Sequence, residues 1–200
     1  FIYNTLNIIS AKSMESSNYD VIEICDQFAQ MLRYSTDMSS RTATMAEEIE
    51  NVHNYLMLAK ARYENNLEFA IDVPENLGSI TVPKLTLQPL VENALTHGLR
   101  ADMENPALSI TVRVQRAILE LCVTDNGCGM DAEKLSRLRE KIESEAAVNS
   151  SIGISNVNNR LRLLFGKEYG VRIESAPGSG TRVTVRIPAI TSSEELENYV

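Results

Sequence analysis

Residues 83–98 read PKLTLQPLVENALTHG and place a run of polar groups on an otherwise apolar helix. At helical spacing, one side of this helix is apolar and consists of Leu87, Leu90, Val91 and Ala94. The other side carries Gln88, Glu92, Asn93, Thr96 and His97. Pro89 suits the first turn, where its missing N–H costs little. A carboxylate beside a carboxamide, followed by an imidazole one turn later, predicts a binding or catalytic site.

The composition is typical of a globular protein with a buried core. The chain has 200 residues, of which 44% are hydrophobic and 23% are charged, and this length allows one or two domains. Its formal net charge of −8 predicts no nucleic-acid partner, because such surfaces use Lys and Arg to neutralise phosphates. A phosphate ligand would therefore be bound locally, by backbone N–H groups, a metal ion or a few cations.

The sequence contains neither a membrane-spanning segment nor a secretory leader. No apolar run approaches the ~20 residues that cross a bilayer, and no charged-then-apolar leader opens the chain, so we expect a soluble piece. It starts at Phe1 without an initiator Met, and we expect an upstream part. The cysteines Cys25, Cys122 and Cys128 lack zinc-ligand spacing and are interpreted as reduced cytosolic thiols.

Residues 1–65 are predicted to form a helical module. No Gly or Pro occurs before Pro74, as expected for uninterrupted helices. Apolar residues recur at three- and four-residue steps along residues 21–32 and 49–63, which is typical of a helical hairpin or a coiled coil. The second helix is expected to begin at Thr44, because Thr44 and Glu47 have the spacing of a capping box.

Residues 66–190 are predicted to form an α+β domain, and residues 191–200 an acidic tail. Beyond position 65 the pattern becomes β-rich, so we place the domain boundary there. Strands are expected at residues 67–73, 108–114, 117–123, 171–175 and 181–187. The second and third strands should form a hairpin over Gln115 and Arg116, and the last two a hairpin over residues 177–180. Further helices are expected at residues 131–144 and 154–165.

Asp125 directly follows a predicted strand and precedes Gly127 and Gly129. A carboxylate there can accept a hydrogen bond from an exocyclic amine such as that of adenine, and the glycines let the backbone approach a flat ligand closely. Alone, D-x-G-x-G is a weak signal, and a plain Asp-Gly turn is the alternative. A Rossmann site and a P-loop are excluded, because neither glycine motif occurs in the required context.

Glu92 and Asn93 suit the chemistry of Mg²⁺. This ion prefers oxygen ligands and often takes few of them from protein, so the side-chain oxygen of Asn93 could suffice. Glu92 would then orient or deprotonate a group near the terminal phosphate. The alternative for both residues is a solvated helix face, and His97 could simply complement the dipole at a helix end.

Two further glycine-containing segments suggest anion binding. Gly153 precedes a helix whose first N–H groups are free to bind an anion. Gly178, Ser179, Gly180 and Thr181 form a flexible turn with hydroxyl groups before the last strand. Each segment is common alone, but the order E-N-x-x-x-H-G, D-x-G-x-G, glycine before a helix, and G-x-G-T is uncommon.

In this order of motifs, residues 66–188 resemble the Bergerat-type ATP-binding domain shared by histidine kinases, Hsp90 chaperones, DNA gyrase and MutL proteins. The resemblance implies a two-layer α/β sandwich with ATP and Mg²⁺ as cofactors. It implies that Asn93 binds Mg²⁺ and that Asp125 binds adenine in a pocket shaped by Gly127 and Gly129. The remaining nucleotide-binding positions implied by it are His97, Gly153, Asn156, Gly180 and Thr181.

The helical half resembles the histidine-kinase module of the LytS/YehU type. The segments that carry this likeness are residues 1–7, 32–34, 48–55 and 61–63, which read FIYNTLN, LRY, EIENVHNY and ARY. In that family Pro-His precedes the first motif, and this His is the phosphoacceptor. Neither His53 nor His97 matches that motif, so we expect no autophosphorylation of this chain by itself. Ser151 replaces a glycine that is usual in the lid of such kinases.

We therefore interpret the chain as the cytoplasmic catalytic part of a membrane-anchored bacterial sensor histidine kinase. The family transfers the γ-phosphoryl group of ATP to a His and then to an Asp of a response regulator receiver domain. The helical module is expected to form a homodimer. Two alternatives stay open: an ATPase of the same fold in which Glu92 activates water, and a non-catalytic nucleotide sensor or dimerisation module.

Overall fold

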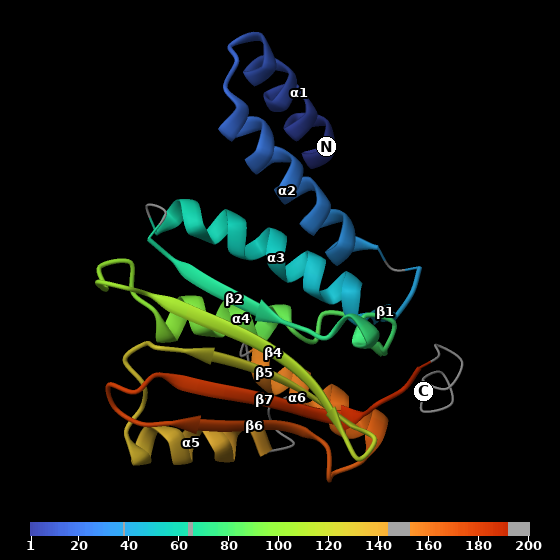
Figure 1. Ribbon diagram of the computed structural model, residues 1–200, viewed down its shortest axis with the longest axis vertical. Helices are drawn as coiled ribbons and strands as arrows, with labels where there is room; N and C mark the ends of the chain where they lie inside the picture. Colours follow the sequence, from blue (N-terminus) through green and yellow to red (C-terminus); the bar gives the residue numbers. More distant parts are fainter. Residues whose placement is uncertain (38, 64–65, 144–152, 192–200) are drawn as a thin grey trace.

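The computed structural model shows a helical hairpin that projects from an α/β body (Figure 1). The structure describes residues 1–37, 39–63, 66–143 and 153–191. The lid position Ser151, the boundary at residue 65 and residues 192–200 of the acidic tail therefore lie outside the described residues. None of the helices in these described ranges is both long and apolar enough to span a membrane.

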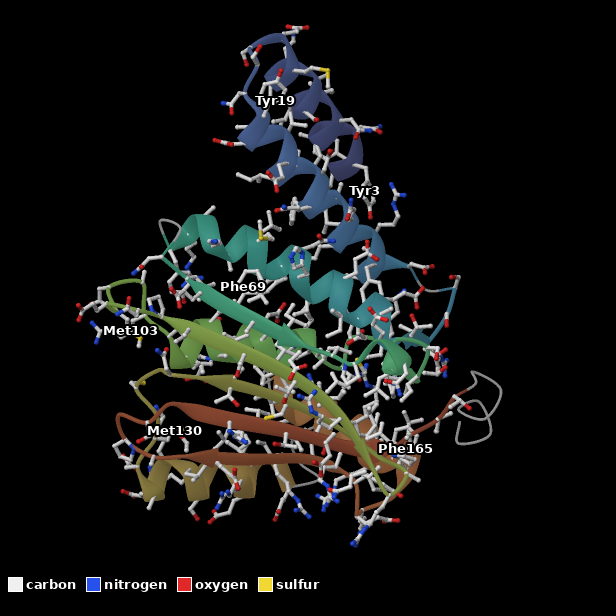
Figure 2. All side chains as sticks on the ribbon, viewed as in Figure 1. Tyr3, Tyr19, Phe69, Met103, Met130 and Phe165 are labelled. Carbon is white, nitrogen blue, oxygen red and sulfur yellow. The ribbon has the colours of Figure 1, made fainter. Side chains whose placement is uncertain are left out.

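The projecting hairpin consists of α1 (Ile2–Glu15) and α2 (Tyr19–Thr36). Asn18 caps α2 by accepting a hydrogen bond from the N–H of Val21. No residue of α1 is buried, and α2 buries only Cys25. Tyr3 and Tyr19 lie on this hairpin, away from the sheet (Figure 2). The hairpin therefore has almost no core of its own.

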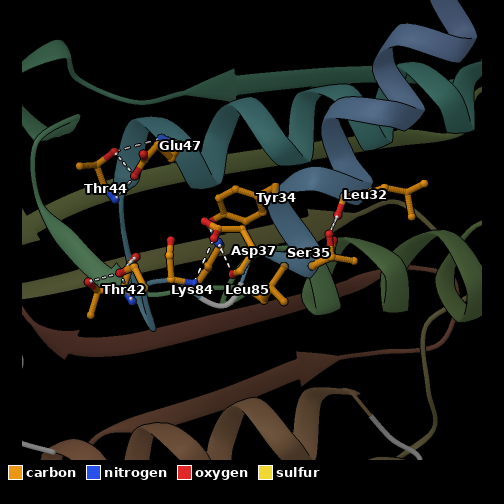
Figure 3. Close-up of polar contacts among 12 residues, drawn as sticks. Leu32, Tyr34, Ser35, Asp37, Thr42, Thr44, Glu47, Lys84 and Leu85 are labelled. Atoms are coloured by element: carbon orange, nitrogen blue, oxygen red, sulfur yellow. Dashed lines mark hydrogen bonds and ion pairs between the residues drawn. The ribbon is translucent and has the colours of Figure 1, made fainter. Parts of the chain in front are cut away.

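The start of α3 (Met45–Arg62) confirms the predicted capping box. The N–H of Glu47 donates to Oγ1 of Thr44 at 3.2 Å, and the N–H of Thr44 donates to Oε2 of Glu47 at 2.7 Å (Figure 3). The expectation of helix throughout residues 1–65 is wrong just before this point. There β1 (Thr42–Thr44) pairs with β3 (Thr81–Pro83), two short strands that we did not predict. The β-branched threonines and the extended backbone of an N-cap suit this pairing.

Helix α3 packs into the core of the α/β body. Its residues Val52 and Leu56 have no exposed surface, and Tyr63 after its last turn is 2% exposed. The hydroxyl of Tyr63 donates to the backbone oxygen of Leu95 at 2.8 Å. All three side chains belong to the same apolar cluster as the sheet. The domain boundary at residue 65 stays a prediction, but α3 shares its core with the domain that follows.

The sheet has the strand order β2-β4-β5-β7-β6, with β2 parallel to β4 and the other neighbours antiparallel. Its strands are β2 (Glu68–Asp72), β4 (Ala107–Gln115), β5 (Ile118–Asp125), β6 (Gly170–Ser175) and β7 (Thr181–Pro188). The predicted strands and hairpins are thus confirmed. The β4–β5 turn lies at Arg116 and Ala117, one residue later than predicted, and both residues have positive φ.

A layer of helices covers one face of this sheet (Figure 1). It consists of α4 (Gln88–Asn93), η2 (Ala94–Gly98), α5 (Ala132–Glu143) and α6 (Gly153–Phe165), while the short η1 (Glu75–Leu77) precedes β3. The apolar side predicted for residues 87–94 is buried in this layer, and Pro89 lies in the first turn of α4 as predicted. The helical part followed by a two-layer α/β sandwich confirms the predicted fold class.

Truncating Leu56 tests whether α3 belongs to the core of the sheet. Leu56→Ala should lower the free energy of unfolding by about 2–5 kcal/mol, because it leaves a cavity in a fully buried site. Urea titrations that follow hydrogen exchange in β5 and β7 measure this loss. Leu163→Ala is the matched control, since Leu163 is 85% exposed and should change stability by about 0.5 kcal/mol or less. Unchanged protection of the sheet in Leu56→Ala would contradict the shared core.

Candidate functional site

The motif residues meet at a cavity of about 260 Å³ between the α4–η2 helix, the end of β5 and α5. Its lining consists of Asn93, His97, Gly98, Asp125, Gly129, Met130, Lys134, Leu138 and Thr181. Residues from four separate parts of the sequence thus face one space. The predicted site residues among them are Asn93, His97, Asp125, Gly129 and Thr181.

Asp125 is held at the end of β5 by backbone donors. Its Oδ1 accepts hydrogen bonds from the N–H of Gly127 at 2.9 Å and from the N–H of Thr181 at 3.3 Å. Within the described residues its Oδ2 has no hydrogen-bond partner, which leaves an acceptor for a ligand. Asp125 is only 4% exposed, and this burial raises the pKa of its carboxyl above the ordinary value, although both N–H groups act in the opposite direction.

The two glycines after Asp125 allow segments to touch where no side chain fits. A Cβ atom on Gly127 would lie 2.0 Å from the backbone oxygen of Gly98. That same oxygen accepts a hydrogen bond from the N–H of Cys128 at 3.1 Å. A Cβ atom on Gly129, which has a φ of +64°, would lie 1.9 Å from the backbone oxygen of Ala176. The D-x-G-x-G segment therefore packs directly, backbone against backbone, on both η2 and the β6–β7 turn.

The β6–β7 turn is fixed to the other side of the site. The N–H of Met130 donates to Oγ of Ser175 at 2.9 Å, and this Oγ donates to the backbone oxygen of Gly180 at 2.8 Å. Gly180 has positive φ, and a Cβ atom there would lie 1.9 Å from the backbone oxygen of Asp125. Gly127 and Gly180 do not line the cavity but set the positions of Asp125 and Thr181 beside it.

Asn93 lies at the end of α4, where the helix changes its hydrogen-bonding pattern. The sequence predicts one regular helix, but residues 94–98 form the π-helical turn η2. The N–H of Leu99 closes this wide turn by donating to the backbone oxygen of Ala94 at 2.8 Å. Asn93 and His97 both line the cavity. Single π-helical turns often occur at functional sites.

Glu92 lies outside this group of residues. Its Oε1 accepts a hydrogen bond from Nε2 of Gln88 at 2.7 Å, and Oε1 of Gln88 accepts one from Nδ2 of Asn51 on α3 at 2.8 Å. Burial and the nearby charge of Glu92 raise the pKa of Tyr55, also on α3. Glu92 thus lies toward α3 and does not line the cavity.

Gly153 and Asn156 belong to the first turn of α6 and are exposed. Neither residue lines the cavity. The start of α6 lies against the first turn of α4, because a Cβ atom on Gly153 would lie 3.2 Å from Cβ of Pro89. The residues before Gly153, in which the lid is expected, are outside the described part of the chain.

Sequence reasoning did not assign Met130, Lys134 and Leu138 to the site, nor Ser175, which bonds to Met130; Gly98 belongs to the E-N-x-x-x-H-G motif but was given no role. Figure 2 shows Met130 at the end of the sheet beside α5. Lys134 and Leu138 are four residues apart on α5, so helical periodicity could have placed them on one face once Asp125 was identified. No sequence pattern around Ser175 pointed to the site, because its role depends on hydrogen bonds to Met130 and Gly180, which lie in other segments.

Comparisons with known proteins agree with this fold. The model described as "Histidine kinase-, DNA gyrase B-, and HSP90-like ATPase" matches residues 83–191, and the model described as "Histidine kinase" matches residues 1–67. The fold and these two matches thus define a domain of this ATPase class attached to a histidine-kinase helical module. The chain belongs to the histidine kinase family, in which it is similar to the LytS/YehU type.

Curated relatives extend beyond this chain. It is 32% identical over 188 residues to the sensor histidine kinase YesM of Bacillus subtilis and 31% identical over 188 residues to the sensor histidine kinase BtsS of Escherichia coli. Each alignment covers 94% of this chain but 31% of the relative. The chain therefore spans about a third of the length of these relatives.

Solved structures support the fold alone. The histidine kinase domain of a blue-light activated kinase from Erythrobacter litoralis has a TM-score of 0.51 at 13% identity, and the match covers 98% of this chain and 86% of that chain. The catalytic domain of histidine kinase ThkA has a TM-score of 0.53 at 21% identity, with 76% of this chain and 97% of that chain covered.

Because the pKa of Asp125 is raised, ionisation of this carboxyl should lower the free energy of unfolding, and the size of this loss should depend on pH. An unfolded Asp titrates near 3.8, and the folded carboxyl titrates above it, so the folded state binds a proton that the unfolded chain has lost. The contribution of Asp125 to stability thus falls as the pH rises through this interval. Asp125→Asn should remove this cost and gain stability relative to the unsubstituted protein between about pH 4 and neutral pH. Urea unfolding across that range measures the difference, and a difference independent of pH would contradict it.

Proposed function

We propose that this chain binds Mg–ATP and acts as the kinase part of a two-component sensor. In this proposal the γ-phosphoryl group of ATP passes to a histidine and then to an Asp of a response regulator. The observation that supports it most is that Asp125 and Asn93, the two residues expected to hold the two ends of the nucleotide, line one cavity.

The cavity offers suitable groups for both ends of the nucleotide. Oδ2 of Asp125 can accept a hydrogen bond from the exocyclic amine of adenine, while the apolar side chains of Met130 and Leu138 can contact the ring. The carboxamide oxygen of Asn93 is the kind of hard ligand that Mg²⁺ accepts. When bound, this ion would neutralise charge on the phosphates. His97 and Lys134 add nitrogen atoms to the lining of the same cavity.

We propose that the acceptor histidine is the residue before Phe1, as the motif of residues 1–7 implies. His53 does not match this motif and lies exposed on α3, with its ring 5.8 Å from the ring of Phe69. We also propose a homodimer through α1 and α2. Large apolar side chains exposed on this hairpin support this, and they are Phe1, Ile2, Ile8, Ile9, Met14, Tyr19 and Ile24.

Catalysis by Glu92 also stays a proposal. An ATPase mechanism would require Glu92 to activate water beside the terminal phosphate. Its carboxylate, however, accepts a hydrogen bond from Gln88 and does not line the cavity. In the kinase, Glu92 could act on a group that arrives from the α3 side. The placement of Glu92 therefore favours phosphoryl transfer over hydrolysis.

Nucleotide titrations test the assignment of Asn93. In calorimetry, Asn93→Ala should weaken binding of Mg–ATP by about tenfold or more, because a ligand of the ion is lost, and should weaken binding of ATP in EDTA much less. Asn54→Ala is the matched control, since Asn54 donates a hydrogen bond to Gln30 on the helical hairpin and does not line the cavity. Equal losses with and without Mg²⁺ would argue against a metal ligand.

Phosphorylation of an extended chain tests the reaction. With Pro-His placed before Phe1, incubation with radiolabelled Mg–ATP should produce phosphate that is acid-labile and base-stable, whereas the chain without this His should stay unlabelled. Glu92→Gln should slow the labelling by about 10²-fold or more if Glu92 is a catalytic base, with nucleotide affinity nearly unchanged. Absence of label on the extended chain despite ATP binding would favour a nucleotide sensor. Steady-state hydrolysis abolished by Glu92→Gln would favour an ATPase.

A further inference from the structure

Glu48 on α3 is an acidic side chain with no exposed surface, and it does not line the nucleotide cavity. Its carboxylate accepts hydrogen bonds from three consecutive backbone N–H groups in the segment before α4. The donors are Leu85 at 2.5 Å, Thr86 at 2.8 Å and Leu87 at 2.8 Å. Leu87 is the N-cap of α4 and has no side-chain cap of its own. Glu48 thus supplies, from another helix, the acceptor that the start of α4 lacks.

Such an arrangement binds a carboxylate strongly and fixes the backbone that surrounds it. A buried charge is costly unless hydrogen bonds and opposite charge compensate it. Arg160 of α6 supplies the opposite charge near Glu48, and its Nη2 donates to the backbone oxygen of Leu85 at 3.0 Å and to Oγ1 of Thr86 at 3.2 Å. Helices α3 and α6 therefore both contact Leu85 and Thr86.

The end of α2 reaches the same carboxylate. The hydroxyl of Tyr34 donates to Oε1 of Glu48, the atom that also accepts from the N–H of Leu85. Burial and the charge of Glu48 raise the pKa of Tyr34, so this hydroxyl stays protonated and remains a donor. Nζ of Lys84 lies 4.7 Å from the centre of the Tyr34 ring and 3.1 Å from Oδ2 of Asp37 (Figure 3).

These contacts form a short path from the helical hairpin to the nucleotide site. Tyr34 lies on α2, Glu48 on α3, and residues 85–87 lead directly into the six-residue helix α4. Asn93 is the last residue of α4. A shift of the loop at the start of so short a helix moves its other end as well.

We propose that Glu48 is a positioning residue through which the end of α2 sets the orientation of α4 and thereby the nucleotide affinity at Asn93. The role of Asn93 in this inference rests on the proposed nucleotide binding. The coupling between Tyr34 and residues 85–93 does not depend on any ligand, so the two proposals can fail separately.

A pair of Tyr→Phe variants tests the path. Tyr34→Phe removes only the hydroxyl that bonds to Glu48 and leaves the three N–H bonds in place. Tyr3→Phe is the matched control, because the Tyr3 hydroxyl joins α1 to α2 through Oγ1 of Thr36 at 3.3 Å and does not contact Glu48. Both variants are compared with the unsubstituted chain by hydrogen exchange of residues 85–93 and by titration with a fluorescent ATP analogue and Mg²⁺, well below the unfolding temperature.

In Tyr34→Phe we expect faster exchange in residues 85–93 and nucleotide affinity weaker by on the order of threefold to tenfold, since a hydrogen bond to a charged group is lost. Tyr3→Phe should change neither quantity. Glu48→Gln should have a larger effect in the same direction, because its amide places a donor against backbone donors; where it fails to fold, Tyr34→Phe decides alone.

The inference is overturned if Tyr34→Phe lowers only the unfolding temperature while exchange of residues 85–93 and nucleotide affinity match those of Tyr3→Phe. That result would give Tyr34 and Glu48 a purely structural role. If the unsubstituted chain binds no nucleotide but Tyr34→Phe still accelerates exchange in residues 85–93, the proposed function fails and the coupling through Glu48 stands.

Discussion

The end of β5 is held against two other segments at distances that leave no room for a Cβ atom. Gly127 touches the backbone of Gly98, and Gly129 and Gly180 touch the backbones of Ala176 and Asp125. The π-helical turn η2, which directly follows Asn93, ends at this contact at Gly98, so the contact also limits the distance between Asn93 and Asp125. The cavity depends on this junction, because the segments that form its walls meet here.

Two kinds of interaction hold these segments in place. The apolar cluster joins the sheet, its helical layer and α3 into one body. A buried polar cluster around Glu48 then fixes the start of α4, where apolar packing alone would leave three backbone N–H groups without partners. Such polar clusters specify one arrangement, since any shift leaves a charge or a donor unpaired. The apolar core gives stability, and the polar cluster gives α4 its position.

The position of α3 connects the two halves of the molecule. It shares the core of the α/β body through Leu56 and Tyr63, and its polar side contacts α2 through Asn54 and Glu48. The hairpin of α1 and α2 has little core beyond these contacts, as expected for helices whose apolar side chains pack against another protein surface. Glu92 also lies on the side of α3. Helix α3 therefore contacts both the helical hairpin and α4, the helix that carries Asn93.

The sequence by itself determined the features that depend on neighbouring residues. The capping box of Thr44 and Glu47 and the buried side of α4 follow from local hydrogen bonding and periodicity, and the order of motifs pointed to the family. Only the tertiary structure decided the β1–β3 pairing, the turn at Arg116, the π-helical end of α4 and the orientation of Glu92 toward α3. These features depend on partners far away in the sequence, and a local pattern contains no information about which distant backbone group or side chain will be adjacent.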